Sequence, residues 1–516
     1  MGLTRAGIAA AALTLLAGCT VGPDYRTPDT PLPESWRQPA PPGPKLDAAA
    51  DAAWWQSFDD PLLTQLIDRA VITNFDLERA RAAIIEARAL RSQAASTFYP
   101  SVDANASVTR SRQTSKGNTT SFGGFNLKTD DRSSINTFYQ AGFDAAWELD
   151  VFGRIQRSVE AAGAFAGAQT EAANDVRLTL IGDVARAYVD ARGLQRRIEV
   201  TRQTIAAQRD TVDLTRARYQ AGTGTGLDAV RAEAQLATFT AALPPLQTAL
   251  AEDIHRLGVL TGQEPQALAD LLEIPAPIPV ADAVPSTGVP ADLLRRRPDI
   301  REAERLLAQA TANIGVAVAD RYPSFTLPGS ITLNNTKLLD MFTSVSLLWS
   351  VGPQVTVPVF DAGRRQAEVE VQRARQRQAL ASYRQTVLLS LEEVENALVA
   401  LSQEKDRRES LQRSVAANTD AVSLSTELYT RGLGTFLDVL DAQRSLFETQ
   451  SDLATSEAAL STDLVSLYKA LGGDWSAGGA EGATSASAPS SASPSSSPSA
   501  RGSAADGDTG TAPSPG

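Results

Sequence analysis

Carboxylate pairs are the side chains of this sequence that could most directly do chemistry. Asp438 and Asp441 stand three residues apart after a glycine turn, and Glu392 is followed directly by Glu393. Two carboxylates can share acid–base work, but acids also stabilise a helix start and are common on a solvated helix face. His255 is the sole histidine, so neither a catalytic triad nor a histidine zinc site can be assembled. We therefore expect neither an enzyme nor a bound cofactor.

A glycine-rich segment suggests a second kind of chemistry, phosphate binding. Gly222, Gly224 and Gly226 are closely spaced, but they follow a helical stretch rather than a strand, and the lysine of a phosphate loop is missing. Residues 219–230 return instead as residues 429–440 without a gap. The two copies share a tyrosine, two glycines and an aspartate, which are Tyr219, Gly222, Gly224 and Asp228 in the first and Tyr429, Gly432, Gly434 and Asp438 in the second.

Other short sequences recur in the same order. Residues 153–154 return as 363–364, residues 76–77 as 299–300, and residues 99–101 as 322–324. The upstream offset is larger, so one segment between the Tyr-Pro and Gly-Arg marks is longer in the first copy. This period greatly exceeds the roughly 20–50 residues of a solenoid repeat. It predicts a duplicated structural unit of the kind that builds pseudo-symmetric membrane assemblies.

The N-terminus has the features of a lipoprotein signal. Arg5 supplies a positive charge, residues 8–16 form an apolar core, and residues 16–19 (LAGC) resemble a bacterial lipobox. The apolar stretch is too short to span a bilayer, which indicates a processed leader. By this resemblance Cys19, the only cysteine, carries lipid and becomes the first mature residue, and no disulfide forms. An ordinary thiol in an uncleaved leader is the alternative. Thr20, in place of an aspartate, favours sorting to the outer membrane.

Composition separates both ends from the centre of the chain. Residues 21–50 are rich in proline and predict an extended strap. Residues 476–516 are almost entirely Ser, Ala, Pro, Gly and Thr, which cannot bury enough apolar area to order a chain. The formal charge of −12 argues against nucleic acid as a partner. Beyond the leader no run of 18 apolar residues exists, which excludes a helical membrane span.

Two uninterrupted stretches predict unusually long helices. Residues 154–221 lack proline, and residues 364–431 lack both proline and glycine. At 1.5 Å per residue each helix is about 100 Å long. Each ends at a glycine turn, from which a second helix returns, and Pro244-Pro245 interrupts the first return helix. Shorter helices, at about 61–98 and 291–321, precede each long one and end at a Tyr-Pro pair.

Between the helices the hydrophobic period changes to two. Apolar residues alternate with polar ones around 102–109, 139–149, 325–333 and 351–359, which is typical of outer-membrane strands. Soluble hairpins packed on helices are the alternative. Each copy therefore contributes two strands, and the chain contributes four. Four strands are too few to close a barrel, and an open sheet edge is not tolerated in lipid. Three copies would supply twelve strands.

Several motifs together resemble the TolC/OprM family of outer-membrane efflux channels, in the lipoprotein branch of the resistance-nodulation-division (RND) systems. The resemblance covers residues 16 to about 475 and is carried by residues 19–25 (CTVGPDY), 297–301 (RPDIR), 349–353 (WSVGP) and 358–364 (PVFDAGR). It implies an internally duplicated α+β membrane protein that forms a homotrimer, with a long α-helical periplasmic barrel joined to a β-barrel completed by trimerisation. It also implies a periplasmic adaptor (membrane fusion) protein, an inner-membrane RND pump, and export of small toxic compounds across the outer membrane.

The same resemblance implies a periplasmic gate at the two glycine turns. Asp438 and Asp441 match aspartates that narrow the pore, and Tyr429 and Asp228 match residues that hold the tip shut. Tyr219 is the counterpart of Tyr429 in the first copy. Where the family has a further arginine, this chain has Gly434. Arg431 is our candidate to replace that arginine.

The expected organisation is a signal peptide (1–18), a lipidated strap (19–60), a first repeat (61–285), a second repeat (286–475) and a disordered tail (476–516). Two other functions stay open: a type I secretion channel, and a periplasmic coiled-coil tether without a pore. The tether needs no strands with an apolar exterior. Cargo is not readable from the residues, because substrate choice would lie in the pump.

Overall fold

The computed structural model describes residues 20–38, 53–115, 119–122, 125–128, 132–281 and 289–473. Cys19, the leader and the predicted tail lie outside these residues. The first repeat contains α3 (Pro61–Thr73), α4 (Phe75–Ser96), β1 (Ser101–Ser115), β4 (Arg132–Leu149), α5 (Arg154–Gln220), α6 (Gly226–Ala241) and α7 (Leu243–Leu260). The second contains α9 (Leu293–Arg296), α10 (Pro298–Ala319), β5 (Ser324–Asn335), β6 (Leu347–Val351), β7 (Gln354–Thr356), α11 (Arg364–Thr430) and α12 (Phe436–Ala470).

Smaller elements connect the two repeats or extend them. They are η1 (Trp54–Phe58), β2 (Thr119–Phe122), β3 (Phe125–Lys128), α8 (Ala269–Leu272), η2 (Pro290–Asp292), η3 (Leu339–Phe342) and η4 (Ser344–Ser346). The β2–β3 hairpin lies in the segment that is longer in the first copy, and the sequence pattern did not predict it.

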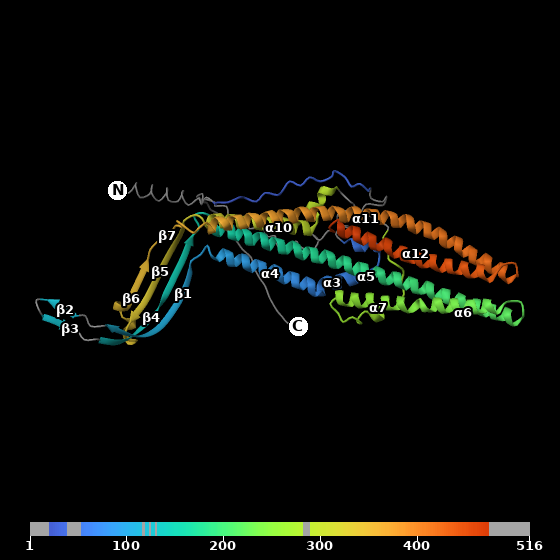
Figure 1. The fold of residues 1–516 in the computed structure, drawn as a ribbon, viewed down its shortest axis with the longest axis horizontal. Helices are drawn as coiled ribbons and strands as arrows, with labels where there is room; N and C mark the ends of the chain where they lie inside the picture. Colours follow the sequence, from blue (N-terminus) through green and yellow to red (C-terminus); the bar gives the residue numbers. More distant parts are fainter. Residues whose placement is uncertain are drawn as a thin grey trace, which may run out of the picture. The chain divides into compact units, whose positions relative to one another are not determined.

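The two long helices are confirmed. α5 and α11 each contain 67 residues, and helices α4, α5, α10 and α11 lie alongside one another in that order (Figure 1). The first return helix is interrupted as predicted, because α6 ends at Ala241 and α7 begins just before Pro244. The second return helix, α12, runs for 35 residues without a break. Within the described residues, none of the helices is long and apolar enough to cross a bilayer.

The shorter helices differ from the prediction, because each is broken near its start. The first breaks at Asn74, between α3 and α4, and the second at Arg297, between α9 and α10. Asn74 has an extended backbone and caps α4 by accepting hydrogen bonds from the backbone N–H groups of Asp76 and Leu77. Arg297 precedes Pro298, which disfavours helical backbone at the residue before it. A cap in one repeat and a proline in the other therefore produce the same break.

Five strands form one antiparallel sheet in the order β1-β4-β5-β6, in which β7 also pairs with β5, while β2 and β3 form a separate two-stranded sheet. β6 pairs with residues 329–333 of β5 and β7 with residues 324–326, so the two follow one another along β5. The sheet is thus four strands wide, as predicted. The fourth strand was predicted to be continuous, but it is split at Gly352-Pro353, because proline cannot donate a ladder hydrogen bond.

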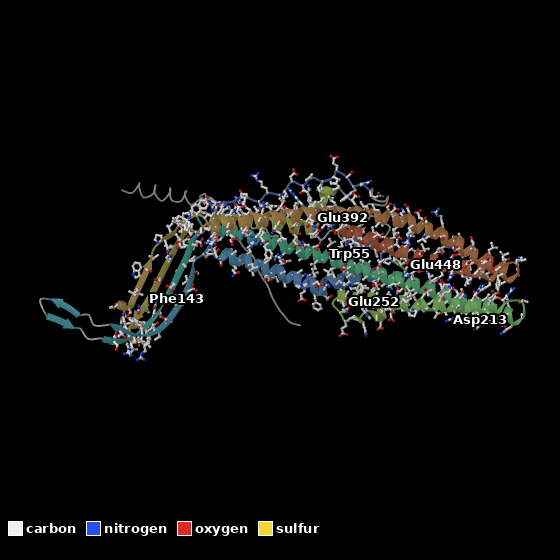
Figure 2. The ribbon with its side chains drawn as sticks, in the orientation of Figure 1. Trp55, Phe143, Asp213, Glu252, Glu392 and Glu448 are labelled. Atoms are coloured by element: carbon white, nitrogen blue, oxygen red, sulfur yellow. The ribbon has the colours of Figure 1, made fainter. Side chains whose placement is uncertain are left out.

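Strand register places the predicted apolar residues on one face of the sheet. Ile331 of β5 pairs with Phe143 of β4 and with Trp349 of β6, and Phe143 pairs with Ala104 of β1. Because side chains alternate between the faces, all the residues in such a row point the same way. This face is exposed in the single chain, where Phe143 projects from the sheet while Trp55 lies among the helices (Figure 2). The opposite face is largely polar and carries Asp144, Glu148, Ser330, Ser350 and Gln354.

The main core lies where α3, α5, α7, α11 and α12 meet. Trp54 stacks on Tyr468 with ring centroids 4.8 Å apart. Tyr188 of α5 donates a hydrogen bond of 2.7 Å to Asp60, whose other carboxylate oxygen caps α3. The core therefore joins the N-terminal segment to both repeats.

Candidate functional site

The candidate site consists of the two glycine turns, one between α5 and α6 and one between α11 and α12. Gly222 and Gly432 have positive φ angles of 71° and 76°. Each turn closes with the hydrogen bonds that end a helix at a left-handed residue, as when the N–H of Thr223 donates to the carbonyl of Arg218 at 2.9 Å. A Cβ at either glycine would meet nothing within 4 Å, so backbone conformation and not space requires glycine here.

At Gly224 and Gly434, by contrast, close packing leaves little room for a side chain. A Cβ at Gly224 would lie 3.1 Å from the Cβ of Arg218, and one at Gly434 would lie 3.1 Å from the Cβ of Leu428. Each turn therefore passes close to the last turn of the helix it leaves. The four predicted turn glycines occupy equivalent places in two equivalent turns.

Asp438 and Asp441, which follow the second glycine turn, differ in their hydrogen bonds. Asp438 accepts hydrogen bonds from the Thr435 hydroxyl at 2.8 Å and the Thr435 backbone N–H at 3.0 Å, and these bonds lower the pKa of Asp438. Thr435 in turn accepts from the Asp438 backbone N–H, which completes a capping box. Asp438 thus caps α12 while its side chain stays exposed. Asp441, one turn later, is also exposed.

The two equivalent tyrosines differ in burial. Tyr219 is 57% exposed, whereas Tyr429 is 6% exposed and packs with Phe436 at a centroid distance of 5.6 Å. Among the described residues, the Tyr429 hydroxyl has no hydrogen-bond partner. Burial raises the pKa of Tyr429, and the negative charge of Asp228 raises it further. Asp228 is therefore close enough to Tyr429 to act on it electrostatically, without a hydrogen bond to its hydroxyl.

The arginines near the turns have distinct partners. Arg431 forms an ion pair with Glu427 on its own helix, at the surface. Arg218 was not singled out from the sequence, yet it joins the two turns. Its Nη1 donates to the carbonyl oxygens of Tyr429 and Thr430, both at 3.0 Å, and its Nη2 to the carbonyl of Thr223 at 3.3 Å.

The only sequence signal for Arg218 is its asymmetry. It precedes the repeated tyrosine of the first copy, where the second copy has Leu428. The two repeats therefore differ in chemistry at this position, because one copy has a charged residue where the other has an apolar one.

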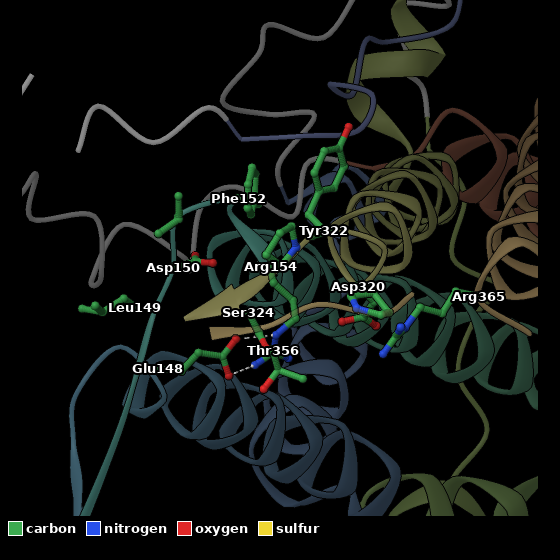
Figure 3. A pocket seen from close by; sticks show the side chains of 14 residues that line it. Glu148, Leu149, Asp150, Phe152, Arg154, Asp320, Tyr322, Ser324, Thr356 and Arg365 are labelled. Carbon is green, nitrogen blue, oxygen red and sulfur yellow. Dashed lines mark hydrogen bonds and ion pairs between the residues drawn. The ribbon is translucent and has the colours of Figure 1, made fainter. Parts of the chain in front are cut away.

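A second, unpredicted feature lies where the sheet joins the helices. A pocket of about 260 Å³ is lined by residues of β4, α5, α10, β5 and the segment before α11 (Figure 3). Glu148 accepts two hydrogen bonds from Arg154, at 2.8 and 2.6 Å. Burial raises the pKa of Asp320, while the positive charges of Arg154 and Arg365 oppose that rise. Opposite charges therefore face each other across this junction, and the Glu148–Arg154 pair ties β4 to the start of α5, the helix that follows it.

Comparison with known proteins identifies the family. The sequence profile of the family described as outer membrane efflux protein matches residues 66–263 and 289–473. Nodulation protein T of Rhizobium leguminosarum bv. viciae is 34% identical over 473 residues, which cover 91% of this chain and 94% of that protein. The toluene efflux pump outer membrane protein TtgC of Pseudomonas putida is 32% identical over 466 residues, covering 89% and 94%.

A solved structure agrees with both sequence comparisons. The structure of the outer-membrane channel OprN superimposes with a TM-score of 0.80 at 35% identity, over 89% of this chain and 100% of that chain. The duplicated long helices, the four-strand-wide sheet and these matches agree along nearly the whole described chain. The chain belongs to the outer membrane efflux protein family.

Proposed function

We propose that this chain is the outer-membrane channel of a tripartite RND-type efflux system that exports small toxic compounds. The observation that carries this proposal is the apolar face of the sheet, which runs unbroken across β1, β4, β5 and β6 in the strand register. A periplasmic tether would have no use for such a face. TtgC, a relative of similar length, is named for toluene efflux. We assign the chain a transport role and no catalytic one.

Assembly follows from the edges of the sheet. β1 and the β6–β7 pair each have one neighbour, so both edges can accept a strand. Three copies pairing edge to edge give a closed twelve-stranded barrel with its apolar face toward lipid. The helices then form a periplasmic barrel that meets an adaptor protein and an inner-membrane RND pump. Cys19 supplies a lipid anchor in the outer membrane.

The gate is proposed at the glycine turns, with Asp438 and Asp441 on one face of α12 because they are three residues apart. A threefold axis makes them two stacked rings of three carboxylates. Like charges about 8 Å apart repel by only about 0.5 kcal/mol in water, and several-fold more where water is excluded. The rings therefore attract cations and oppose closure. Contacts elsewhere at the tip, with Tyr429 and Asp228 among them, hold it shut.

Single-channel recording of the purified protein in planar bilayers tests this function. We expect a cation-selective pore, and replacement of both Asp438 and Asp441 by Asn should reduce cation selectivity and block by trivalent cations. Asp213→Asn, which removes an exposed acid from α5, is the matched control and should change neither. Unchanged selectivity in the double variant would place the aspartates outside the constriction. Absence of any channel in the wild type would refute the function itself.

A further inference from the structure

One cation joins the two hairpin tips of a single chain, and we infer that Arg218 is the latch that holds the tip closed. The inference rests on the proposed function, which places the constriction at these turns. Arg218 lies in the last turn of α5, in the first repeat. Its partners lie at the end of α11, in the second repeat, and in the turn that follows α5. It is therefore a positioning residue that acts by keeping two hairpins together.

The contacts of Arg218 use most of its guanidinium group. Nη1 is shared between two consecutive carbonyls at the end of α11, and Nη2 binds the carbonyl of Thr223. The guanidinium carbon also lies 4.6 Å from the centroid of the Tyr429 ring, within the range of a cation–π contact. The planar guanidinium holds donors along its edge at fixed separations while its face lies on the ring, a geometry that a compact ammonium group does not reproduce.

The position of these acceptors strengthens the contact. The carbonyls of Tyr429 and Thr430 belong to the C-terminal end of a 67-residue helix, where unpaired carbonyls and the helix dipole both favour a positive charge. Tyr429 itself is buried with Phe436, Val439, Val212 and Ala232. Partial exclusion of water makes hydrogen bonds to a charged donor stronger. The acceptors of these hydrogen bonds are all backbone atoms, and the Tyr429 ring is the one side chain of the second hairpin that Arg218 is shown to contact.

Neighbouring arginines make no such connection. Arg431 pairs with Glu427 within α11, and Arg216 pairs with Glu233 within the first hairpin, at 2.7 Å. Of these three arginines, Arg218 alone connects one hairpin with the other. Arg218 can therefore take the place of the arginine that the family has where this chain has Gly434. In this chain the cation of the closed tip comes from the first repeat.

Opening the tip requires the second hairpin to move away from the first. Such a movement breaks the two charge-assisted hydrogen bonds to Tyr429 and Thr430 together with the ring contact, so the resting equilibrium lies toward the closed state. The latch opens when a partner displaces the second hairpin.

Conductance of the full-length protein in planar bilayers tests the latch. Arg218→Ala should raise the ratio of open to closed time by at least about tenfold, the factor that corresponds to the loss of a single hydrogen bond to a charged group. Arg218→Lys should give an intermediate ratio, because one ammonium cannot hold both ends of the link. Arg216→Ala removes an arginine two residues away whose pair stays within one hairpin, and it should match the wild type. Melting temperatures of all the variants should agree within a few degrees.

The outcomes separate the latch from the function on which it rests. If the wild type forms no channel, the proposed function fails. If the wild type conducts and Arg218→Ala has the same open-to-closed ratio as Arg216→Ala, the latch is refuted while the channel stands. If Arg218→Ala does not assemble, Arg218→Lys decides the matter, and a ratio equal to that of the wild type overturns the inference.

Discussion

Asn74 and Arg297 occupy equivalent places in the two repeats and hold the same helix break with different chemistry. The Asn74 amide donates to the carbonyl of Leu260, the last residue of α7, at 3.0 Å. Arg297 donates to the carbonyl of Ala470, the last residue of α12, at 2.8 Å. Both side chains are buried, and a buried polar group is costly unless it is paired. Each therefore ties the short helix of a repeat to the end of its return helix.

Arg297→Ala should lower the stability of the protein by about 2 kcal/mol, because it removes the charged hydrogen bond to the Ala470 carbonyl and leaves the partly buried Asp299 without its cation. Arg297→Asn, which copies the residue of the other repeat, should retain more stability than Arg297→Ala. Thermal unfolding of the purified protein, followed by circular dichroism at about 222 nm, measures both. Arg79→Ala breaks an exposed ion pair with Asp76 and should have little effect. Equal melting temperatures for Arg297→Ala and Arg79→Ala would contradict this assignment.

At the scale of elements, the strap of residues 20–38 is tied to the junction between sheet and helices. The Val21 N–H donates to the carbonyl of Phe152 at 3.2 Å, next to the start of α5. Arg157 of α5 is almost fully buried and pairs with Asp24 of the strap at 2.6 Å. Gly22 packs against Gly315 of α10 so closely that a Cβ on Gly22 would lie 2.5 Å from the Gly315 Cα. Two glycines and one arginine thus position the start of the described chain.

Gly315→Ala should loosen this strap. A Cβ at Gly315 would lie 2.8 Å from Cγ and Cδ of Arg157 and would push the arginine away from Asp24. Limited trypsin digestion with mass spectrometry should show faster cleavage at Arg26. In Gly163→Ala the new Cβ lies at an ordinary 3.5 Å from the Arg91 side chain, so cleavage should stay at the wild-type rate. Alanine is the better helix former, so accelerated cleavage in Gly315→Ala alone cannot come from a weakened helix. Identical rates in both variants would show that the contact does not hold the strap.

At the scale of the whole molecule, the two faces of the sheet separate lipid from the pore. The apolar face can be buried only by a bilayer or by other chains, and the open edges call for further copies of the same sheet. The charged contacts of the sheet lie on the opposite face and at its junction with the helices, as with Glu148 and Arg154. One sheet therefore meets the needs of both environments.

Adjacent residues of β5 allow a matched test of this division. Ile331→Lys places a charge on the apolar face, where a lysine near the bilayer midplane costs about 2–4 kcal/mol, and the amount of trimer in washed outer membranes should fall sharply. Ser330→Lys places the same charge on the polar face opposite Asp144 and should leave trimer levels close to those of the wild type. Native gel electrophoresis of membrane fractions measures both. Equal levels for the two variants would mean that the apolar face does not contact lipid.

The elements with regular periods could be predicted from the sequence. The long helices, the interrupted return helix, the alternating strands and the turn glycines all followed from residue types and spacing, because backbone propensity and hydrophobic period are local properties. The predictions failed where a single residue could act in two ways. Asn74 looks like an ordinary polar residue of a helix, and its role as a cap appears only when the end of α7 lies beside it. Proline at 353 likewise split a strand whose apolar alternation continues across the break.

The tertiary structure alone decided how duplicated residues differ. Tyr219 and Tyr429 occupy the same place in the repeated sequence, yet one is exposed and the other buried, because burial depends on neighbours that come from other segments. Likewise Arg218 gains its role only when the end of α11 lies within reach of its guanidinium group. A contact between residues about two hundred positions apart leaves no periodic signal in the chain. The sequence determined that there are two similar hairpins, and the packing of one against the other determined which residues join them.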